Sequence, residues 1–311
     1  MQARMLFPHW DANWKRFEKE YLPLSHKFWS NPASKPDEKI YMSFWGAKSP
    51  AVDQIALGLG YRTVEEYKER PYEEFSQEVI RRIRIGLGAT NTIESFLSKS
   101  HKGKTAASRL YSEPHNMVSC IFRELGRQKL PFRLQERSLK FMLKALPRWL
   151  TAPDFEISGN IKGRLICMRH PEAPFGISIN NGERDMGAVG GLFCYLGKTP
   201  AFTITNIQGE SIIALKRARR RQHGKLLAQY EAMDKVLGMH WQNRLVNEMQ
   251  NLLGKRLGIT VIGRLPVNHV SGAEYNRQKL MYEKAYLATG FRLKGKVFVC
   301  KPQSPRRVLR K

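Results

Sequence analysis

The residues with the clearest chemical potential are a cluster of cations between positions 216 and 225. Six of the ten residues are Lys or Arg, and at helical spacing several of them share one side. Such a density of like charges is unfavourable unless an anion neutralises it, and phosphate suits both guanidinium and ammonium groups. The cluster therefore predicts phosphate contact, with a solvated helix face as the alternative. Its members are Lys216, Arg217, Arg219, Arg220, Arg221 and Lys225.

Two smaller groups of cations suit the same chemistry. The first is Lys102 and Lys104, in a segment over 86–114 whose glycines, serines and threonines predict an exposed basic loop. The second is Arg306 and Arg307, in a basic C-terminal tail over 301–311 that is expected to be a flexible arm. Both groups are predicted to contact nucleic acid.

The net charge of the chain extends this interpretation beyond the clusters. It is +26, from 53 basic and 27 acidic residues, and both halves of the chain are basic. This excess predicts a polyanionic partner. Nucleic acid is favoured over a membrane because the cations are spread along a chain with six Trp and fifteen Phe, and are not gathered on one amphipathic helix. A basic enzyme surface and ribosome association are the alternatives.

Composition also argues against several classes of protein. No apolar run is long enough to span a membrane, and the first residues lack the apolar core of a signal peptide, so a cytoplasmic protein is expected. The four cysteines are widely spaced and form no CxxC pair. This spacing argues against a zinc site and a disulfide framework, so no metal is expected. The cysteines are Cys120, Cys167, Cys194 and Cys300.

The elements that position these residues fall into two predicted domains. Residues 1–154 form a mostly helical, aromatic-rich domain. A capping-box pattern begins a short helix at Thr63, and Pro71 begins a longer one. Helices are expected at about 11–21, 63–70, from 71 onward, 116–127 and 134–147.

Residues 155–300 form the second predicted domain, in which β-prone runs replace the helical spacing. Four strands joined by short turns predict an antiparallel meander. A basic insertion follows at 209–237, and then a helix, a strand, a second helix and a last strand that begins at Phe291. The four strands are 162–169, 175–179, 190–196 and 201–207, and the later elements are 240–257, 259–266, 278–289 and 291–299.

This order of elements resembles the GCN5-related N-acetyltransferase (GNAT) family. The specific match is the sequence Ala-Tyr-Leu-Ala-Thr-Gly-Phe at 285–291, which is similar to the family's Tyr-x-x-x-Gly-Phe. The resemblance covers about 155–300. It implies an α+β fold, in which a helical N-terminal region packs on a mixed, mainly antiparallel sheet with flanking helices.

The resemblance also implies a site that binds acetyl-CoA or another acyl-CoA. Tyr286 would protonate the departing thiolate, His269 would lie among substrate-facing residues as a base, and Glu210 would hold a substrate amine. The alternatives are a core tyrosine, a surface histidine and a helix-capping glutamate. Residues expected to contact the cofactor are Ile207, Gly209, Gly238, Met239 and His240.

The sequence departs from the family pattern at two places. The pyrophosphate loop is matched only at Gly224, and Lys279 replaces the asparagine seven residues before the tyrosine. A second likeness is to the VirK/YbjX family, through Asn-Ile-Gln-Gly at 206–209 and Asn-His-Val at 268–270.

Three functions are compatible with these patterns. The first is acyl transfer to an amine on a nucleic acid, or on a protein bound to it. The second is non-catalytic binding of RNA or DNA by a degenerate acyltransferase fold. The third, small-molecule acyl transfer, leaves the charge unexplained, because coenzyme A does not require a net charge of +26.

Overall fold

The structure is a computed structural model of the chain, and it divides into two compact units. The first unit comprises Met1–Lys104, Ser112–Lys144 and Val267–Tyr275, and the second comprises Thr105–Tyr111, Ala145–Pro266 and Asn276–Lys311. The residues that the structure describes are 72–99, 109–110, 112–128, 130–170, 173–182, 185–209, 220–266, 272–295 and 297–300.

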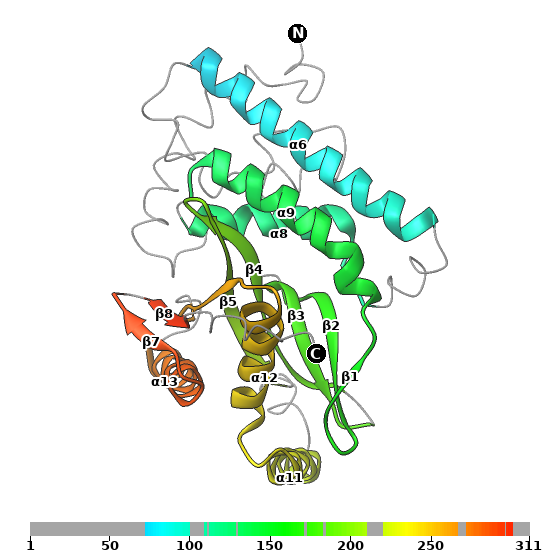
Figure 1. Cartoon of the computed structure of the whole chain (residues 1–311), viewed down its shortest axis with the longest axis vertical. Helices are drawn as coiled ribbons and strands as arrows, with labels where there is room; N and C mark the ends of the chain where they lie inside the picture. The colour runs from blue at the N-terminus through cyan, green and yellow to red at the C-terminus, as the bar shows by residue number, and fades with distance from the viewer. Residues whose placement is uncertain are drawn as a thin grey trace, which may run out of the picture. The chain divides into compact units, whose positions relative to one another are not determined.

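The described part of the first unit is helical (Figure 1). It contains α6 (Tyr72–Lys99), α8 (Pro114–Arg127) and the first two thirds of α9 (Phe132–Thr151). Helices α6 and α8 contact each other. Their shared core consists of apolar side chains that recur every three or four residues, which is the spacing of one helix face. The most buried of them are Ile83, Ile93, Met117, Val118, Ile121, Phe122 and Leu125.

The predicted loop over 86–114 is wrong for its first half, because α6 continues to Lys99. Ala89 and Ile93 are buried, and this burial offsets the low helix propensity of the local glycines. The hydroxyl of Thr90 donates to the Gly86 carbonyl, so it does not compete with the helix for a backbone partner. The predicted helices at 11–21 and 63–70 lie outside the described residues.

The predicted helices at 116–127 and 134–147 are confirmed as α8 and α9, but α9 runs four residues beyond Pro147. Trp149 gives the reason for the extension. Its side chain is buried, its indole N–H donates to the Ile166 carbonyl at 3.0 Å, and its ring meets Phe175 and Phe193 edge to face. The last turn of α9 is therefore held by aromatic packing.

The second unit is built on an eight-stranded mixed sheet, in the order β1-β2-β3-β4-β5-β6-β8-β7. Strands β1 to β5 are successively antiparallel, so the predicted meander is confirmed. The four predicted strands are longer than expected, and β1 is an additional strand. The strands are β1 (Phe155–Ser158), β2 (Ile161–His170), β3 (Ala173–Asn180), β4 (Asp185–Leu196) and β5 (Thr199–Gly209).

Strand β6 (Thr260–Gly263) lies parallel to β5, and helices connect the two strands. The described part of the connection comprises α11 (Arg220–Leu237) and α12 (Trp241–Met249), followed by a π-helix, η2 (Gln250–Arg256). The predicted helix at 240–257 is thus confirmed in extent, with its second half wound as a π-helix. Helix α12 packs against β3 and β4.

The last predicted strand is wrong, because 291–299 forms a hairpin of two strands (red in Figure 1). Helix α13 (Gly272–Ala288) begins six residues earlier than expected and leads into β7 (Arg292–Lys294). The chain turns at Gly295 and returns as β8 (Val297–Cys300), which pairs with both β6 and β7. The described fold is therefore a mixed α/β arrangement with a mainly antiparallel sheet, as predicted at that level.

Candidate functional site

Strands β5 and β6 part after a short parallel contact. Their pairing ends at Ile204 and Gly263, and the next amide along, that of Arg264, donates to the Ile204 carbonyl at 3.1 Å. Beyond this point β5 continues to Gly209 while β6 has ended. The two strands therefore leave a gap in which the β5 backbone needs other partners.

A β-bulge lies at the start of this gap. Gly190 and Gly191 of β4 oppose Asn206 and Ile204 of β5, which leaves Thr205 as the extra residue. A Cβ on Gly191 would lie 1.8 Å from the Thr203 carbonyl oxygen, so only glycine fits there. The bulge rotates the end of β5 relative to its first half, and so sets where its amides point in the gap.

Tyr282 of α13 occupies the gap on the β5 side. Its hydroxyl oxygen accepts a hydrogen bond from the Ile207 amide at 2.7 Å, and its side chain is buried. Ile207 was predicted to contact the cofactor. Its backbone donor is therefore already paired within the molecule.

Tyr286 lies one helical turn further along α13 and faces the β6 side. Its hydroxyl donates to the Arg264 carbonyl at 3.0 Å, and its ring packs against Phe291 and Phe298 with both centroids 5.2 Å away. The residue is fully buried, and burial is the main reason that its pKa is raised well above 10. The nearby Tyr282 raises this pKa further, while the positive charge of Arg264 opposes the shift.

Of the other residues predicted to contact the cofactor, Gly209 ends β5 and three lie in the turn between α11 and α12. Gly238 has a φ of 65° and ends α11, Met239 is half-buried, and His240 precedes α12. The carboxylate of Asp234 accepts the Trp241 amide at 2.7 Å and lies 3.8 Å from His240 Nε2. An anionic side chain thus caps α12 at the position where the resemblance expects a pyrophosphate.

Most of the predicted cationic sites are outside the described structure. Lys225 is exposed on α11, and for Arg220 and Arg221 only the backbone in the first turn of that helix is described. Two of the three predicted catalytic residues are also not described. The residues outside the described ranges are Lys102, Lys104, Glu210, Lys216, Arg217, Arg219, His269, Arg306 and Arg307.

A separate groove of about 760 Å³ lies between α12, η2, β6 and the β7–β8 hairpin. Basic side chains from both walls line it, including Arg244 of α12 and Arg292 and Lys294 of β7, together with the amides of Asn247 and Asn251. Arg244 is held by Glu248 at 3.0 Å. The lining is polar and carries charges of both signs, since Glu248 also lines the groove.

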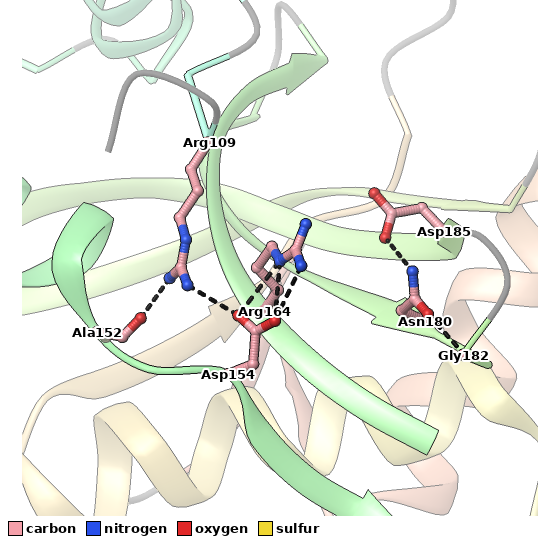
Figure 2. A network of polar contacts seen from close by, with 7 residues as sticks. All are labelled: Arg109, Ala152, Asp154, Arg164, Asn180, Gly182 and Asp185. Atoms are coloured by element: carbon pink, nitrogen blue, oxygen red, sulfur yellow. Dashed lines mark hydrogen bonds and ion pairs between the residues drawn. The ribbon is translucent and has the colours of Figure 1, made fainter. Parts of the chain in front are cut away.

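A polar network fixes the first strands of the sheet (Figure 2). Asp154 accepts from Arg109 at 2.8 Å and is bound side-on by Nε and Nη2 of Arg164. Arg109 also donates to the Ala152 carbonyl. The hydrogen bond from Arg164, followed by the charges of Arg164 and Arg109, lowers the pKa of Asp154, although partial burial opposes this. The network thus joins the residue just before β1 to Arg109 and to Arg164 of β2.

Sequence reasoning missed Tyr282 and Asp234, whose side chains bind the Ile207 and Trp241 amides of the predicted acyl-CoA site. Tyr282 lies four residues before Tyr286, so the two tyrosines share a helix face, a relation that is readable from spacing. Asp234 lies seven residues before the amide that it caps, across a glycine turn, and no local pattern indicates that contact.

Comparison of the chain with family models, with curated proteins and with solved structures finds no match. Within the described ranges, no group of three or more His, Cys, Asp or Glu residues is placed to hold a metal ion. None of the described helices is both long enough and apolar enough to cross a membrane.

Proposed function

We propose that this protein binds nucleic acid without catalysing acyl transfer, on a sheet of GNAT-like topology. The observation that carries the binding function is the net charge of +26. A charge of this size raises the local concentration of polyanions and drives association through counterion release. The proposal extends the second of the hypotheses drawn from the sequence.

The order of the strands supports the GNAT-like assignment. A run of antiparallel strands leads to a parallel pair, β5 and β6, that parts after four residue pairs, and the tyrosine helix follows β6. The bulge at Thr205 lies where the strands part. This is the arrangement that the sequence resemblance implies for a fold that holds a thioester between two splayed strands.

The residues at that position do not fit an acyl-CoA. The Ile207 amide, which the carbonyl of a thioester would need, already donates to Tyr282. The Trp241 amide, which a pyrophosphate would need, already donates to the Asp234 carboxylate, and a phosphate placed beside that carboxylate would be repelled. The Tyr286 hydroxyl donates its hydrogen bond to the Arg264 carbonyl, and the side chain is buried away from solvent. We therefore infer that the site is closed.

Two titrations test this proposal. Isothermal calorimetry with acetyl-CoA is expected to give no heat of binding, while a labelled mixed-sequence duplex binds with an affinity that falls steeply as salt rises. Absence of nucleic-acid binding even at low salt would remove the proposal. Acetyl-CoA binding at low millimolar affinity or tighter would remove its non-catalytic half.

Acyl transfer is the second candidate, and the position of Tyr286 beside the parted strands is the observation that favours it. Under this alternative, Tyr286→Phe lowers turnover and leaves acyl-CoA binding nearly intact, because only a proton donor is lost. Tyr282→Ala separates the two candidates. In a closed site this substitution removes the group that covers the Ile207 amide, so acyl-CoA binding would appear only in the variant.

A further inference from the structure

Every exposed position of α9 from Phe132 to Lys144 carries a cation. The exposed residues in this range are Arg133, Arg137, Lys140 and Lys144, and the positions between them are buried or half-buried. Their spacing of four, three and four residues places them in a single line along the helix. We call these four residues the α9 basic stripe.

The stripe has a definite length and a fixed spacing of charges. Eleven residues separate its ends, which at about 1.5 Å per residue is roughly 16 Å. Each strand of a duplex carries one phosphate per about 3.4 Å of axis, so the stripe matches the rise of about five phosphates. The helix fixes the spacing of the charges before any partner binds, so that ordering them costs little on association.

The stripe is only partly neutralised among the described residues. Glu136, the acidic residue beside it, is half-buried and contacts Lys140 at 2.7 Å and Arg81 of α6 at 3.3 Å. Across the part of the chain that the structure describes, neither Arg133 nor Lys144 has a carboxylate partner. Neighbouring like charges at these spacings weaken a helix, so the line of cations is a cost unless something outside the fold uses it.

The neighbouring aromatic ring is not available to stack on a base. Phe132 begins α9, and the guanidinium of Arg82 lies 4.1 Å from its ring centre, with that of Arg81 at 5.9 Å. Arg82 is 3 % exposed, so this cation lies in the interior of the unit. The stripe therefore offers charge and hydrogen-bond donors, which suit a phosphate backbone and carry no base specificity.

We propose that the α9 basic stripe is a docking surface for the phosphodiester backbone of nucleic acid. This inference rests on the proposed function and adds the place where contact is made. It is distinct from the cation cluster at 216–225. The charge complementarity of an uninterrupted line of cations is what commits it to this partner.

The test is a comparison of two variants that lower the net charge equally. The stripe variant carries Arg133→Gln, Arg137→Gln, Lys140→Gln and Lys144→Gln. The control variant changes four exposed cations of the second unit, through Lys198→Gln, Lys235→Gln, Arg277→Gln and Lys284→Gln. Binding of short mixed-sequence DNA and RNA duplexes and of single strands is measured over a salt series, and urea unfolding confirms that both variants fold.

We expect the stripe variant to lose at least about tenfold in affinity, and its plot of log K against log salt to flatten by about 0.9 for each lost duplex contact. The control variant is expected to change little. Equal salt slopes in the two variants would contradict the assignment of the stripe as a docking surface, but not the proposal that the protein binds nucleic acid. If the wild-type protein bound no nucleic acid at low salt, the proposed function and the stripe would both fall.

A second measurement uses the unaltered protein and does not depend on how the variants fold. Acetylation of lysines by a water-soluble reagent is followed by mass spectrometry, with and without a DNA duplex. Protection of Lys140 and Lys144, but not of Lys198 and Lys284, is the expected result. Protection by poly-glutamate or anionic vesicles equal to that by the duplex would show a general anion surface and overturn the assignment to nucleic acid.

Discussion

The gap between β5 and β6 and the exposed side of α9 use their polar groups in opposite ways. In the gap, the hydroxyls of Tyr282 and Tyr286 both bind backbone groups of the same chain, and both rings are buried. On α9, the cations point outward and two of them lack a carboxylate partner among the described residues. The gap therefore stabilises the fold, and the stripe remains open to a partner.

This difference separates stability from binding. Substitutions in the gap are expected to change the free energy of unfolding with little effect on affinity for nucleic acid. Substitutions in the stripe are expected to do the reverse. Under the proposed function, the residues that suggested chemistry lie inside the core and the residues that bind lie on a separate helix.

The largest expected effect is that of Tyr286→Ala. Removing a fully buried ring that packs against Phe291 and Phe298 is expected to lower the free energy of unfolding by about 3–5 kcal/mol. Urea unfolding followed by circular dichroism measures this loss. The control is Leu287→Ala, whose side chain is 59 % exposed and which should change stability little. Equal effects of the two substitutions would contradict the assignment of Tyr286 to the core.

Gly263→Ala tests how tightly Tyr286 is held against β6. A Cβ on Gly263 would lie 2.7 Å from the Tyr286 ring, so the ring or the strand must move, at a cost of about 1–3 kcal/mol. The comparison is Gly224→Ala in α11, where an added Cβ meets nothing within 4 Å. That change is expected to stabilise the helix by about 0.5–1 kcal/mol. Thermal melting should give shifts of opposite sign, and two shifts of the same sign would exclude the close contact.

Tyr286→Phe removes only the hydroxyl, and we expect a loss of about 1 kcal/mol in the free energy of unfolding. The hydroxyl also makes stability pH-dependent, because burial raises the pKa of Tyr286 well above 10. Below about pH 10 both states keep the proton, and above it the unfolded state ionises first, so stability falls as pH rises. Absorbance of tyrosinate during alkaline titration should show one fewer late-ionising group in the variant. Early ionisation of Tyr286 would mean that the gap opens in the native state.

Asp154→Asn tests a charge that is satisfied within the fold. Its Arg partners lower the pKa of Asp154, so the ionised form stabilises the fold above the unfolded value of about 3.9, and this contribution is lost as pH falls through the lower folded value. Because the carboxylate is partly exposed, the expected loss at neutral pH is at most about 1 kcal/mol. Urea midpoints of wild type and variant should converge as pH falls through the lowered pKa of Asp154, with Glu156→Gln as the exposed control. A difference that persisted in acid would point to packing.

The smallest expected effect has the opposite sign. Neutralising the α9 basic stripe removes three like-charge pairs and at least one bridge, that between Lys140 and Glu136, for a net gain of at most about 0.5 kcal/mol in the free energy of unfolding. Differential scanning calorimetry of the four-glutamine variant measures this gain. A clear loss of stability would show that the cations serve the fold, and the comparison between stripe and gap would fail.

The sequence predicted the meander well because its strands have short turns and regular alternation, and these are local signals. The prediction failed where contacts between residues distant in sequence determine the secondary structure. The helix over 86–99 depends on burial of Ala89 and Ile93, and the hairpin at Gly295 depends on the pairing of β8 with β6. The partner of Tyr286 is a backbone carbonyl 22 residues earlier, which spacing cannot reveal. The α9 basic stripe was not identified from the sequence, although its residues have the spacing of one helix face.

The two ends of the sheet bear on how the protein behaves at high concentration. An open strand edge offers unpaired amides and carbonyls to another copy, and this is a common route to aggregation. Here the end strands β1 and β7 span only four and three residues, and β7 carries Arg292 and Lys294 with all its residues exposed. The β7 edges of two copies carry the same charge and repel each other. A protein with so many β-prone residues is in this way discouraged from joining edge to edge, and salt that screens Arg292 and Lys294 should weaken that protection.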